Sequence, residues 1–453
     1  MDIERETEVP VLFSSNTNHD VARDCITSET SIQKNKNCLF FSRRGMADST
    51  ESRVFIGACF LLGFISSYLV TTNGAESIQH PRRNLVDDTI FDVMQYGAKA
   101  DGKTDDSMAL IKAWKAACGA NGSAKVVING QFMVGEVVFT GPCSNKDTIT
   151  IEIHGNVSAS SDPSSYSHGA WIMVQHAQNV EVTGGGTINA HGQDFWGYAS
   201  GDSPLPVSFV FQAVGNCKMY NLNLVDSMGF HIKVTDSHDV AVYNLTITAP
   251  ATSPNTDGLH LSNATNVNVT DSIIGTGDDC ISIGPGSRNV LVSGITCGPG
   301  HGISIGSLGK RDGETNVQGL TIKNCTLTGT SNGARIKTYR DSPQLNASGI
   351  VYQDIVMNRV KNPIIIDQHY NSKSKSEQSS VKISDVHFIN IKGTTISQTP
   401  VNLDCSTKFP CEDIELADID FEPIGPIRLK SACASARTLL KGVQNPPGPA
   451  TCV

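Results

Sequence analysis

Acidic and basic side chains recur in four short segments between residues 253 and 339. The segments read SPNTDGLHLS, GTGDDCISIG, GPGHGISIG and NGARIKTY, and each places its polar group just before or on a short run typical of a β-strand. Together they contribute three carboxylates, one imidazole and two cations: Asp257, Asp278, Asp279, His301, Arg335 and Lys337. If the segments are stacked copies of one unit, these groups share one face. Such a set could perform acid–base chemistry on an anionic substrate.

The acidic residues of these segments fit the needs of glycoside hydrolysis. Asp257 and Asp278 are one copy apart and should be neighbours, and Asp279 joins them only if Gly277–Asp279 bends before its strand. Close like charges raise at least one pKa, which favours a protonated acid beside ionised bases. A carboxylic acid can then protonate the leaving oxygen while a carboxylate directs water or attacks.

The remaining three groups complete the predicted site. His301 lies one copy further on, between two glycines, where it could tune the proton of the acid. Arg335 and Lys337 are two positions apart on one strand, so they share a face and suit the binding of a sugar carboxylate. The alternative for these two cations is plain charge compensation of the three aspartates.

The elements that must position these residues are repeats. A run of alternating apolar residues, then Asn, Asp or Gly, then further apolar residues occurs eight times, starting at Cys217, Val240, Val267, Val290, Leu320, Ile350, Val381 and Ile414. Helices of 10–15 residues do not fit between copies so closely spaced, so the pattern favours a solenoid over a Rossmann or barrel fold. The sequence therefore predicts an all-β protein, a right-handed parallel β-helix, whose Asn or Asp residues mark the bends.

A second short strand lies between successive copies and carries the polar groups. These strands read FHIKV, GLHLS, CISIG, GISIG, ARIKTY and PIIID. Because neighbouring strands are ~4.8 Å apart, the turns from Asp257 to Tyr370 would give a row of roughly 20 Å. That row suits a groove for a polymer. Ahead of it, Asp105–Cys118 has helical spacing in Met108, Ile111 and Trp114, and we expect a short N-terminal capping helix.

Composition limits the partners and the compartment. The formal net charge of −9 argues against nucleic acid and anionic membranes. Residues 1–45 read as a polar, disordered N-terminal extension, and 46–75 as a signal peptide or signal anchor around the apolar run Val54–Val70. A membrane contact is expected only if that run is an uncleaved anchor. Ten downstream cysteines and several N-x-S/T sequons favour a secreted, disulfide-bonded glycoprotein, with one β-helix domain at 84–453.

Four motifs resemble those of a known enzyme family. NTDG at 255–258, GDD at 277–279, GHG at 300–302 and RIK at 335–337 are similar to the signature motifs of the family 28 glycoside hydrolases, the polygalacturonases. The resemblance covers roughly 84–452, and the longer segments look like the plant members, in particular the pollen-type exo-acting group. It implies an inverting, extracellular hydrolase of α-1,4-linked galacturonan in the plant cell wall. Its substrate would be a pectic polysaccharide.

The same resemblance implies residue roles and disulfides. Asp278 would be the general acid, Asp257 and Asp279 would hold the attacking water, and His301 would support the acid. Asn255, Arg335, Lys337 and Tyr370 would bind substrate. The implied disulfides are Cys118–Cys143, Cys280–Cys297, Cys405–Cys411 and Cys433–Cys452, which leaves Cys217 and Cys325 free. We expect no metal, no cofactor and a monomer.

Other functions remain compatible with the sequence. A related β-helix hydrolase could act on a decorated pectin such as rhamnogalacturonan or xylogalacturonan. A pectate lyase shares the fold but would need calcium and a basic residue for elimination. A cell-wall binding protein without activity is the non-enzymatic alternative. Exo and endo action are both open, and the polar stretch NSKSKSEQSS after Tyr370, where plant relatives often have a cysteine pair, leaves the substrate subsites there undefined.

Overall fold

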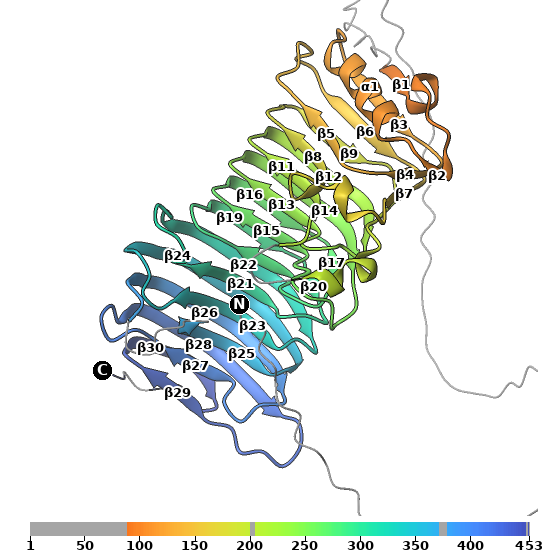
Figure 1. The fold of residues 1–453 in the computed structure, drawn as a ribbon. Helices are drawn as coiled ribbons and strands as arrows, with labels where there is room; N and C mark the ends of the chain where they lie inside the picture. Colours follow the sequence, from red (N-terminus) through yellow and green to blue (C-terminus); the bar gives the residue numbers. More distant parts are fainter. Residues whose placement is uncertain (1–87, 200–203, 371–377, 450–451, 453) are drawn as a thin grey trace, which may run out of the picture. The chain divides into compact units, whose positions relative to one another are not determined.

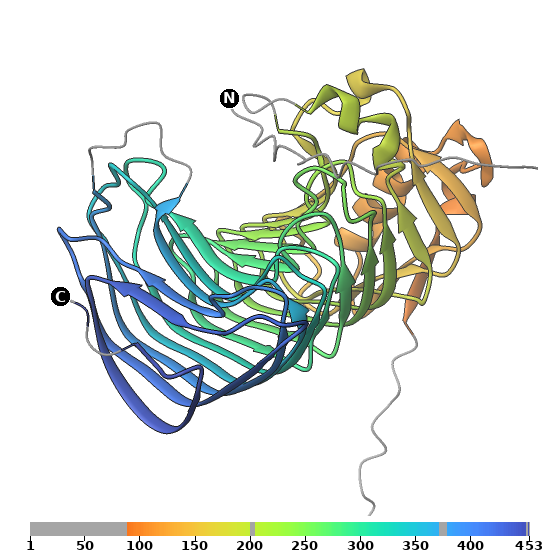
Figure 2. The same ribbon diagram turned by 90° about the horizontal axis from the view of Figure 1, so that it is seen from below.

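The computed structural model describes residues 88–199, 204–370, 378–449 and 452, which form two sheets of parallel strands. The strands follow one another in sequence order along the stack (Figures 1 and 2). The predicted N-terminal extension, signal or anchor segment and most of the NSKSKSEQSS stretch lie outside the described residues. Within the described ranges no helix is long and apolar enough to cross a membrane.

One sheet has 11 strands and carries the predicted polar groups. Its strands, in sequence order, are β5 (Val137–Thr140), β8 (Ala170–Gln175), β11 (Val207–Gln212), β13 (Ile232–Thr235), β15 (Leu259–Ser262), β18 (Ile281–Ile283), β21 (Ile303–Leu308), β23 (Asn332–Tyr339), β25 (Asn362–Tyr370), β27 (Val401–Asp404) and β29 (Ser431–Ala434). Each strand pairs in parallel with the strand of the next turn.

The other sheet has 19 strands and contains the eight repeated apolar runs. Its strands are β1 (Thr89–Asp92), β2 (Asp101–Asp105), β3 (Ala124–Ile128), β4 (Gln131–Val134), β6 (Ile149–Ile153), β7 (Asn156–Ala159), β9 (Val180–Thr183), β10 (Thr187–Asn189), β12 (Gly215–Val225), β14 (His238–Thr248), β16 (Thr265–Thr270), β17 (Ile273–Gly275), β19 (Arg288–Ser293), β20 (Thr296–Cys297), β22 (Val317–Thr328), β24 (Leu345–Val360), β26 (Val381–Thr395), β28 (Cys411–Pro423) and β30 (Ala436–Asn445). The predicted right-handed parallel β-helix is confirmed.

The core of the β-helix is a stack of apolar side chains that repeats from turn to turn. In the 11-stranded sheet Ile232, Leu259, Ile281 and Ile303 are successive register partners, and each is at most 1% exposed. Because side chains alternate across a strand, the residues between these core positions face outward. Apolar burial therefore fixes which side chains can form a site on the outer face.

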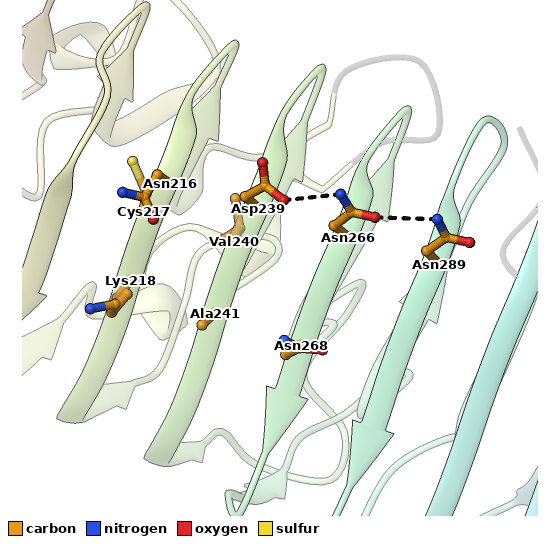
Figure 3. Close-up of a pocket in the computed structure, with 9 residues that line it drawn as sticks. All are labelled: Asn216, Cys217, Lys218, Asp239, Val240, Ala241, Asn266, Asn268 and Asn289. Carbon is orange, nitrogen blue, oxygen red and sulfur yellow. Dashed lines mark hydrogen bonds between the residues drawn. The ribbon is translucent and has the colours of Figure 1, made fainter.

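The bends between strands are made by residues in the left-handed backbone region. One such series, here called the second ladder, runs through Asn221, Asn244, Asp271, Gly294, Asn324, Asp354, Asn390 and Asp418, all with positive φ. A parallel first ladder contains Asp239, Asn266 and Asn289, whose side chains form a chain of hydrogen bonds from turn to turn (Figure 3). Asn, Asp and Gly tolerate this conformation best, so the prediction that they mark the bends is confirmed.

One predicted repeat is out of register. Ile350 pairs with Val386, and Val386 with Ile414, so the copy in β26 begins at Val386 and not at Val381. The error has a physical cause, because each turn contains two left-handed positions. Asp385 belongs to the first ladder, whereas Asn390 occupies the second-ladder bend of this turn. The other seven starting positions lie in mutual register.

A helix precedes the regular turns, as predicted, but one of the three residues expected on its buried face is exposed. Helix α1 (Ser107–Cys118) packs against β1, β3 and β5 and buries Leu110, Ala113 and Trp114. Met108, which we expected on the apolar face, is 60% exposed. The alanines of the helix supply the contact instead, so spacing of large apolar residues alone was misleading. Short 3-10 helices are found at η1 (Val93–Tyr96), η2 (Pro163–Ser165), η3 (Gly192–Asp194) and η4 (Trp196–Tyr198).

The cysteine pairing agrees with that implied by the resemblance. Disulfides join Cys118 to Cys143, Cys280 to Cys297, Cys405 to Cys411 and Cys433 to Cys452. Cys217 and Cys325 are free thiols buried in the core. The Cys280–Cys297 bond links two segments that lead into the acidic turns, so it ties the predicted site to the neighbouring turn.

Candidate active site

Three of the predicted residues occupy one position of successive turns. Asp257, Asp279 and His301 each lie two residues before Leu259, Ile281 or Ile303, which are register partners. In the following turn the same position is held by Asn332, because Ile303 pairs with Ala334. Arg335 and Lys337 do not occupy this position: they lie further along β23, and Lys337 reaches Asp279 through the length of its side chain.

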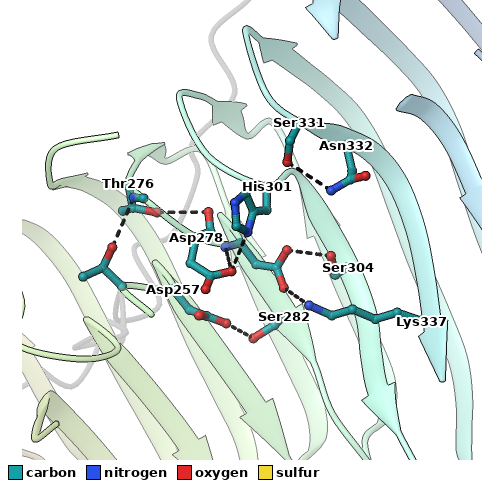
Figure 4. A network of polar contacts seen from close by, with 12 residues as sticks. Asp257, Thr276, Asp278, Ser282, His301, Ser304, Ser331, Asn332 and Lys337 are labelled. Atoms are coloured by element: carbon teal, nitrogen blue, oxygen red, sulfur yellow. Dashed lines mark hydrogen bonds and ion pairs between the residues drawn. The ribbon is translucent and has the colours of Figure 1, made fainter. Parts of the chain in front are cut away.

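Asp278 and His301 form the outer part of the cluster. The Asp278 carboxylate accepts hydrogen bonds at Oδ1 from the backbone N–H of Asp279 at 2.7 Å and from His301 Nδ1 at 2.9 Å (Figure 4). The predicted bend at Gly277–Asp278 is present. It requires glycine, because a Cβ on Gly277 would lie 2.0 Å from the carbonyl oxygen of Ser253.

Asp279 and Lys337 form a buried ion pair below the outer pair. Lys337 Nζ lies 2.7 Å from Asp279 Oδ2, and Ser304 Oγ donates to Asp279 Oδ1 at 2.7 Å. The Asp279 side chain is 1% exposed and that of Lys337 is 8% exposed. Burial alone would lower the pKa of Lys337, but the charge of Asp279 outweighs it and raises that pKa. Lys337 thus places an ammonium at hydrogen-bond distance from the Asp279 side chain.

Asp257 is held by a short relay from the next turn. Ser282 Oγ donates to Asp257 Oδ2 at 2.6 Å, and His260 Nδ1 lies 2.7 Å from the same Ser282 oxygen. The Ser282 hydroxyl has one hydrogen, and that hydrogen points to Asp257. His260 Nδ1–H is therefore the donor in the hydrogen bond between His260 and Ser282. Burial lowers the pKa of His260 to about 3, with further lowering by Lys233 and Lys337, so its imidazole is neutral. Buried His231 fixes the backbone, its Nδ1 lying 3.2 Å from the carbonyl oxygen of Asp257.

The pKa values of Asp257 and Asp278 are shifted in opposite directions. Burial, together with the charges of Asp278 and Asp279, raises the pKa of Asp257 well above its ordinary value. Burial would also raise the pKa of Asp278, but the hydrogen bond and the charge of His301 outweigh it and lower that pKa. The hydrogen bond to Asp278 in turn raises the pKa of His301. The prediction that crowding raises one carboxyl pKa fits these directions, with Asp257 as the raised group.

Exposure separates the groups that can touch a ligand from those that support them. The side chains of Asp278 and His301 are 23% and 43% exposed, whereas Asp257 is 5% exposed as a residue. Polar atoms of Asp278, Asp279 and His301 lie within 4.8 Å of one another. A ligand approaching the outer face therefore meets Asp278 and His301 first, with Asp257 and Asp279 beneath.

Tyr370 lies beside the two cations, and Asn255 lies in the turn two residues before Asp257. The Tyr370 ring centre is 5.1 Å from the Arg335 guanidinium carbon and 5.2 Å from Lys337 Nζ, which fits cation–π contacts. Arg335 Nε is buried without a hydrogen-bond partner among the described residues. Asn255 is exposed in a left-handed turn, and its side chain makes no hydrogen bond within the described ranges.

Sequence reasoning missed the supporting residues of the site. Ser282 and Ser304 each donate to the aspartate 25 residues earlier, and His260 stands behind Ser282. A signal was available, because His260, Ser282, Ser304 and Arg335 are the outward polar positions of four aligned strands. Polar residues that recur at an outward strand position are common on surfaces, so this signal alone would not have identified a site.

Comparison with known proteins gives consistent results. The model of the glycosyl hydrolases family 28 matches residues 118–440. A polygalacturonase of Gossypium barbadense is 42% identical over 366 residues, covering 79% of this chain and 89% of the relative. An exopolygalacturonase of Platanus acerifolia is 38% identical and covers 79% and 97%, respectively. The crystal structure of an endo-xylogalacturonan hydrolase from Aspergillus tubingensis has a TM-score of 0.71 at 23% identity, covering 80% of this chain and 100% of that one, and supports the fold alone.

Proposed function

The chain belongs to family 28 of the glycosyl hydrolases, and on that premise we propose that it hydrolyses the α-1,4-glycosidic bonds of polygalacturonate in pectin. The observation that carries the proposal is the convergence of Asp257, Asp278, Asp279 and His301 with Arg335, Lys337 and Tyr370 on the outer face of one sheet. Acids and cations are both needed, because the substrate is an acetal that carries a carboxylate on every ring.

Asp278 is the proposed general acid. Asp278 and Asp279 each contact a cation, and the side chain of Asp278 is the more exposed of the two. Asp278 is hydrogen-bonded to His301, whose raised pKa keeps a proton on the imidazole. Once protonated, Asp278 would donate its own proton to the leaving oxygen. Asp257 and Asp279, which lie beneath it, would hold the water that attacks the opposite face of the sugar and inverts the anomeric centre.

The free protein carries the protons that this mechanism requires, but they lie on other residues than in the reactive arrangement. In the free protein the pKa directions favour protons on His301 and Asp257 and leave Asp278 ionised. The reactive arrangement needs the acidic proton on Asp278 and a carboxylate at Asp257. Substrate binding would therefore be accompanied by the transfer of one proton from Asp257 to Asp278, since the titrations of these two residues are linked.

Arg335 and Tyr370 are the proposed contacts to a sugar carboxylate and a sugar ring. Arg335 keeps a donor without a partner, and Tyr370 offers an aromatic face next to it. Lys337 is already paired with Asp279, so its main role would be to hold that side chain in position. Asn255 would contact the substrate from its exposed turn. The activity would reside in one domain at 84–453, secreted as a monomer into the plant cell wall.

The test is hydrolysis of polygalacturonate by the wild-type chain and the Asp278→Asn variant. The wild type should release reducing ends without ultraviolet-absorbing products, and the variant should lose about 10²- to 10⁴-fold in rate. Asp271→Asn, in the second ladder, is the matched control and should retain full activity. Full activity of Asp278→Asn would contradict the assignment of the acid. Preference for xylogalacturonan or rhamnogalacturonan would redirect the substrate, and the sizes of the products would distinguish exo from endo action.

A further inference from the structure

A pocket lies on the same side of the stack as the acids, further toward the N-terminal end of the sheet. Asp257 lies on the connection from β14 to β15, and Asp278 and Asp279 lie on that from β17 to β18. The equivalent connections of earlier turns are those from β7 to β8 and from β10 to β11. By register β11 and β8 precede β15 by two and three turns, or about 10–15 Å. Described residues of these two connections enclose a pocket of about 430 Å³, which is within the size range of small-molecule sites.

Aromatic and apolar side chains line this pocket. Tyr166 and Phe195 form an edge-to-face pair with ring centres 5.8 Å apart, and Tyr198, which also lines the pocket, is 67% exposed. Other lining residues are Pro163, Leu205 and Pro206, and none of the described residues that line the pocket carries a charge. Such walls can pack against the apolar face of a sugar ring or a methyl group, but they offer no partner to a carboxylate.

The charged residues next to the lining are acidic. Asp162 and Asp194 are exposed, and each directly precedes a lining residue. Glu136 accepts a hydrogen bond from the backbone N–H of Ser167 at 2.7 Å and also contacts His168, so this imidazole is not an unpaired cation. A ligand carboxylate in the pocket would therefore be placed among like charges, which is unfavourable. A neutral ligand avoids that cost.

The outward row of the sheet also loses its charge in this direction. Lys233, which pairs in register with His260, is followed by Val210, Met173 and Val138 in the earlier turns. These three residues belong to a small apolar cluster that is separate from the main core. Both the pocket and the row beside it are therefore apolar, whereas Arg335 and Lys337 lie on the other side of the acids.

Phe230 connects the pocket to the acidic turns. It occupies the position of Asp257 in the preceding turn, because the two strands that follow are in register. Its ring is partly exposed, and the ring centre lies 5.0 Å from that of His260. The residue before it, Gly229, donates a backbone hydrogen bond at 2.9 Å to the carbonyl oxygen of Pro206, which lines the pocket. An apolar path thus runs from the pocket to the catalytic turns.

We propose that this pocket binds a methyl-esterified, and hence uncharged, galacturonate ring of the pectin chain, with Tyr198 stacked on the ring. The proposal rests on the proposed function and adds a specificity to it. The part of the chain bound at Arg335 and Tyr370 carries free carboxylates, whereas the part bound at the pocket is esterified. The enzyme would then favour partially esterified pectin over the fully charged polymer.

The test measures binding to the Asp278→Asn protein by calorimetry, which avoids turnover, with hexagalacturonate and with the same oligomer after partial methyl esterification. Tyr198→Ala, added to that parent, should weaken binding of the esterified oligomer about 3- to 10-fold, in line with the loss of one aromatic contact, and leave the free oligomer unaffected. Tyr198→Phe keeps the ring and should bind both like the parent. Leu439→Ala, which removes an exposed apolar side chain on β30, is the matched control and should also bind like the parent.

A substitution that adds charge tests the same claim from the other direction. Pro204 is exposed and lines the pocket. Pro204→Arg would place a guanidinium there and should tighten binding of the free hexagalacturonate about 3- to 10-fold through a charge-assisted contact. The esterified oligomer should gain less, so the preference of the parent for it should shrink.

Three results would overturn the proposal: no binding of the esterified oligomer to the parent, unchanged affinity in Tyr198→Ala, or equal losses for the two oligomers. Tyr198→Ala should not lower the unfolding temperature, since the side chain is largely exposed. The outcome is separable from that for the proposed function. If the wild type fails to cleave polygalacturonate while the Tyr198 effect on binding persists, the pocket assignment stands and the activity does not.

Discussion

In the second ladder and in the acidic turns, equivalent residues of successive turns stack in the same way, but the two stacks have different roles. In the ladder, equivalent positions carry Asn, Asp or Gly, and Asn390 Nδ2 donates to Asp354 Oδ1 of the preceding turn at 2.7 Å. In the acidic turns, equivalent positions carry Asp257, Asp279 and His301, and the bonding partners come from other positions of the next turn. Repetition of Asn, Asp or Gly at one position of each turn gives a row of bends. Variation between Asp and His at one position gives a set of different chemical groups.

The difference shows where the fold tolerates charge. Ladder side chains such as Asn244 and Asn324 are exposed, and water can satisfy them. Asp257, Asp279 and Lys337 are buried at 5%, 1% and 6% exposure, so each depends on a specific partner. Removing a partner should therefore be mild in the ladder and severe in the acidic turns. Four predictions follow from this contrast, in order of decreasing effect.

Lys337→Met should give the largest loss of stability. It leaves the buried Asp279 carboxylate without its ammonium, and breaking one side of a buried ion pair costs about 3–5 kcal/mol. Activity should fall with it, because Lys337 would no longer hold the Asp279 side chain in place. Denaturant unfolding of Lys337→Met and of the exposed-pair variant Lys218→Met gives the comparison. A loss below about 1 kcal/mol in the Lys337 variant would show that Asp279 does not depend on this partner.

Ser282→Ala should give an intermediate effect. The substitution leaves a buried oxygen of Asp257 without its hydrogen-bond donor, which costs about 1–3 kcal/mol, and raises the already raised pKa of that carboxyl. The rate on polygalacturonate should fall, and the pH at which activity appears should shift upward. Ser262→Ala, on the same outer face but bonded to Thr235, is the control. Identical pH profiles in the two variants would argue against the relay.

Asn390→Ala should be milder and confined to stability. Alanine at a φ of 48° is disfavoured by about 1–2 kcal/mol, and the bond to Asp354 is lost. Asn390→Gly removes the same bond without backbone strain and should retain most of the stability. Both variants should hydrolyse polygalacturonate at the wild-type rate, as thermal unfolding and reducing-end assays can establish. Loss of activity in Asn390→Gly would show that the ladder does more than form the bend.

The pH dependence of His301 should give the smallest change. Its pKa lies above the ordinary 6.5 because of the pairing, so the contact with Asp278 is complete below pH 6.5 and is lost as the pH rises through the folded-state value. On the acid side the pair persists until the pH falls through the lowered pKa of Asp278, below 3.8. The unfolding temperature of the wild type should thus decline as the pH rises above 6.5, whereas that of His301→Asn should not show this decline. A decline of equal size in the variant would contradict this.

The sequence allowed the turns to be predicted because their signal is local and repeated. Alternating apolar residues and a bend residue identify seven of the eight copies, and the eighth failed because Asp385 and Asn390 are both bend residues of one turn. The acids were identified from their positions in consecutive copies, and the resemblance supplied the disulfides. These features depend on spacing along the chain, which a sequence displays directly.

The partners within the site could not be predicted in the same way. Lys337 was expected on an open face, but its long side chain turns to Asp279. Ser282 and Ser304 look like ordinary outward residues of a strand until the register is known. Contacts between turns need the register and the length of each side chain.

The proposed mechanism requires Asp278 to give the proton and Asp257 to hold the water. Asp278→Asn and Asp257→Asn are each assayed on polygalacturonate and on a galacturonide with a nitrophenyl leaving group, which needs no acid to depart. Asp278→Asn should lose activity on the polymer yet retain it on the nitrophenyl substrate, and Asp257→Asn should lose both. The reverse pattern, with the nitrophenyl substrate still cleaved by Asp257→Asn alone, would contradict the account and make Asp257 the acid.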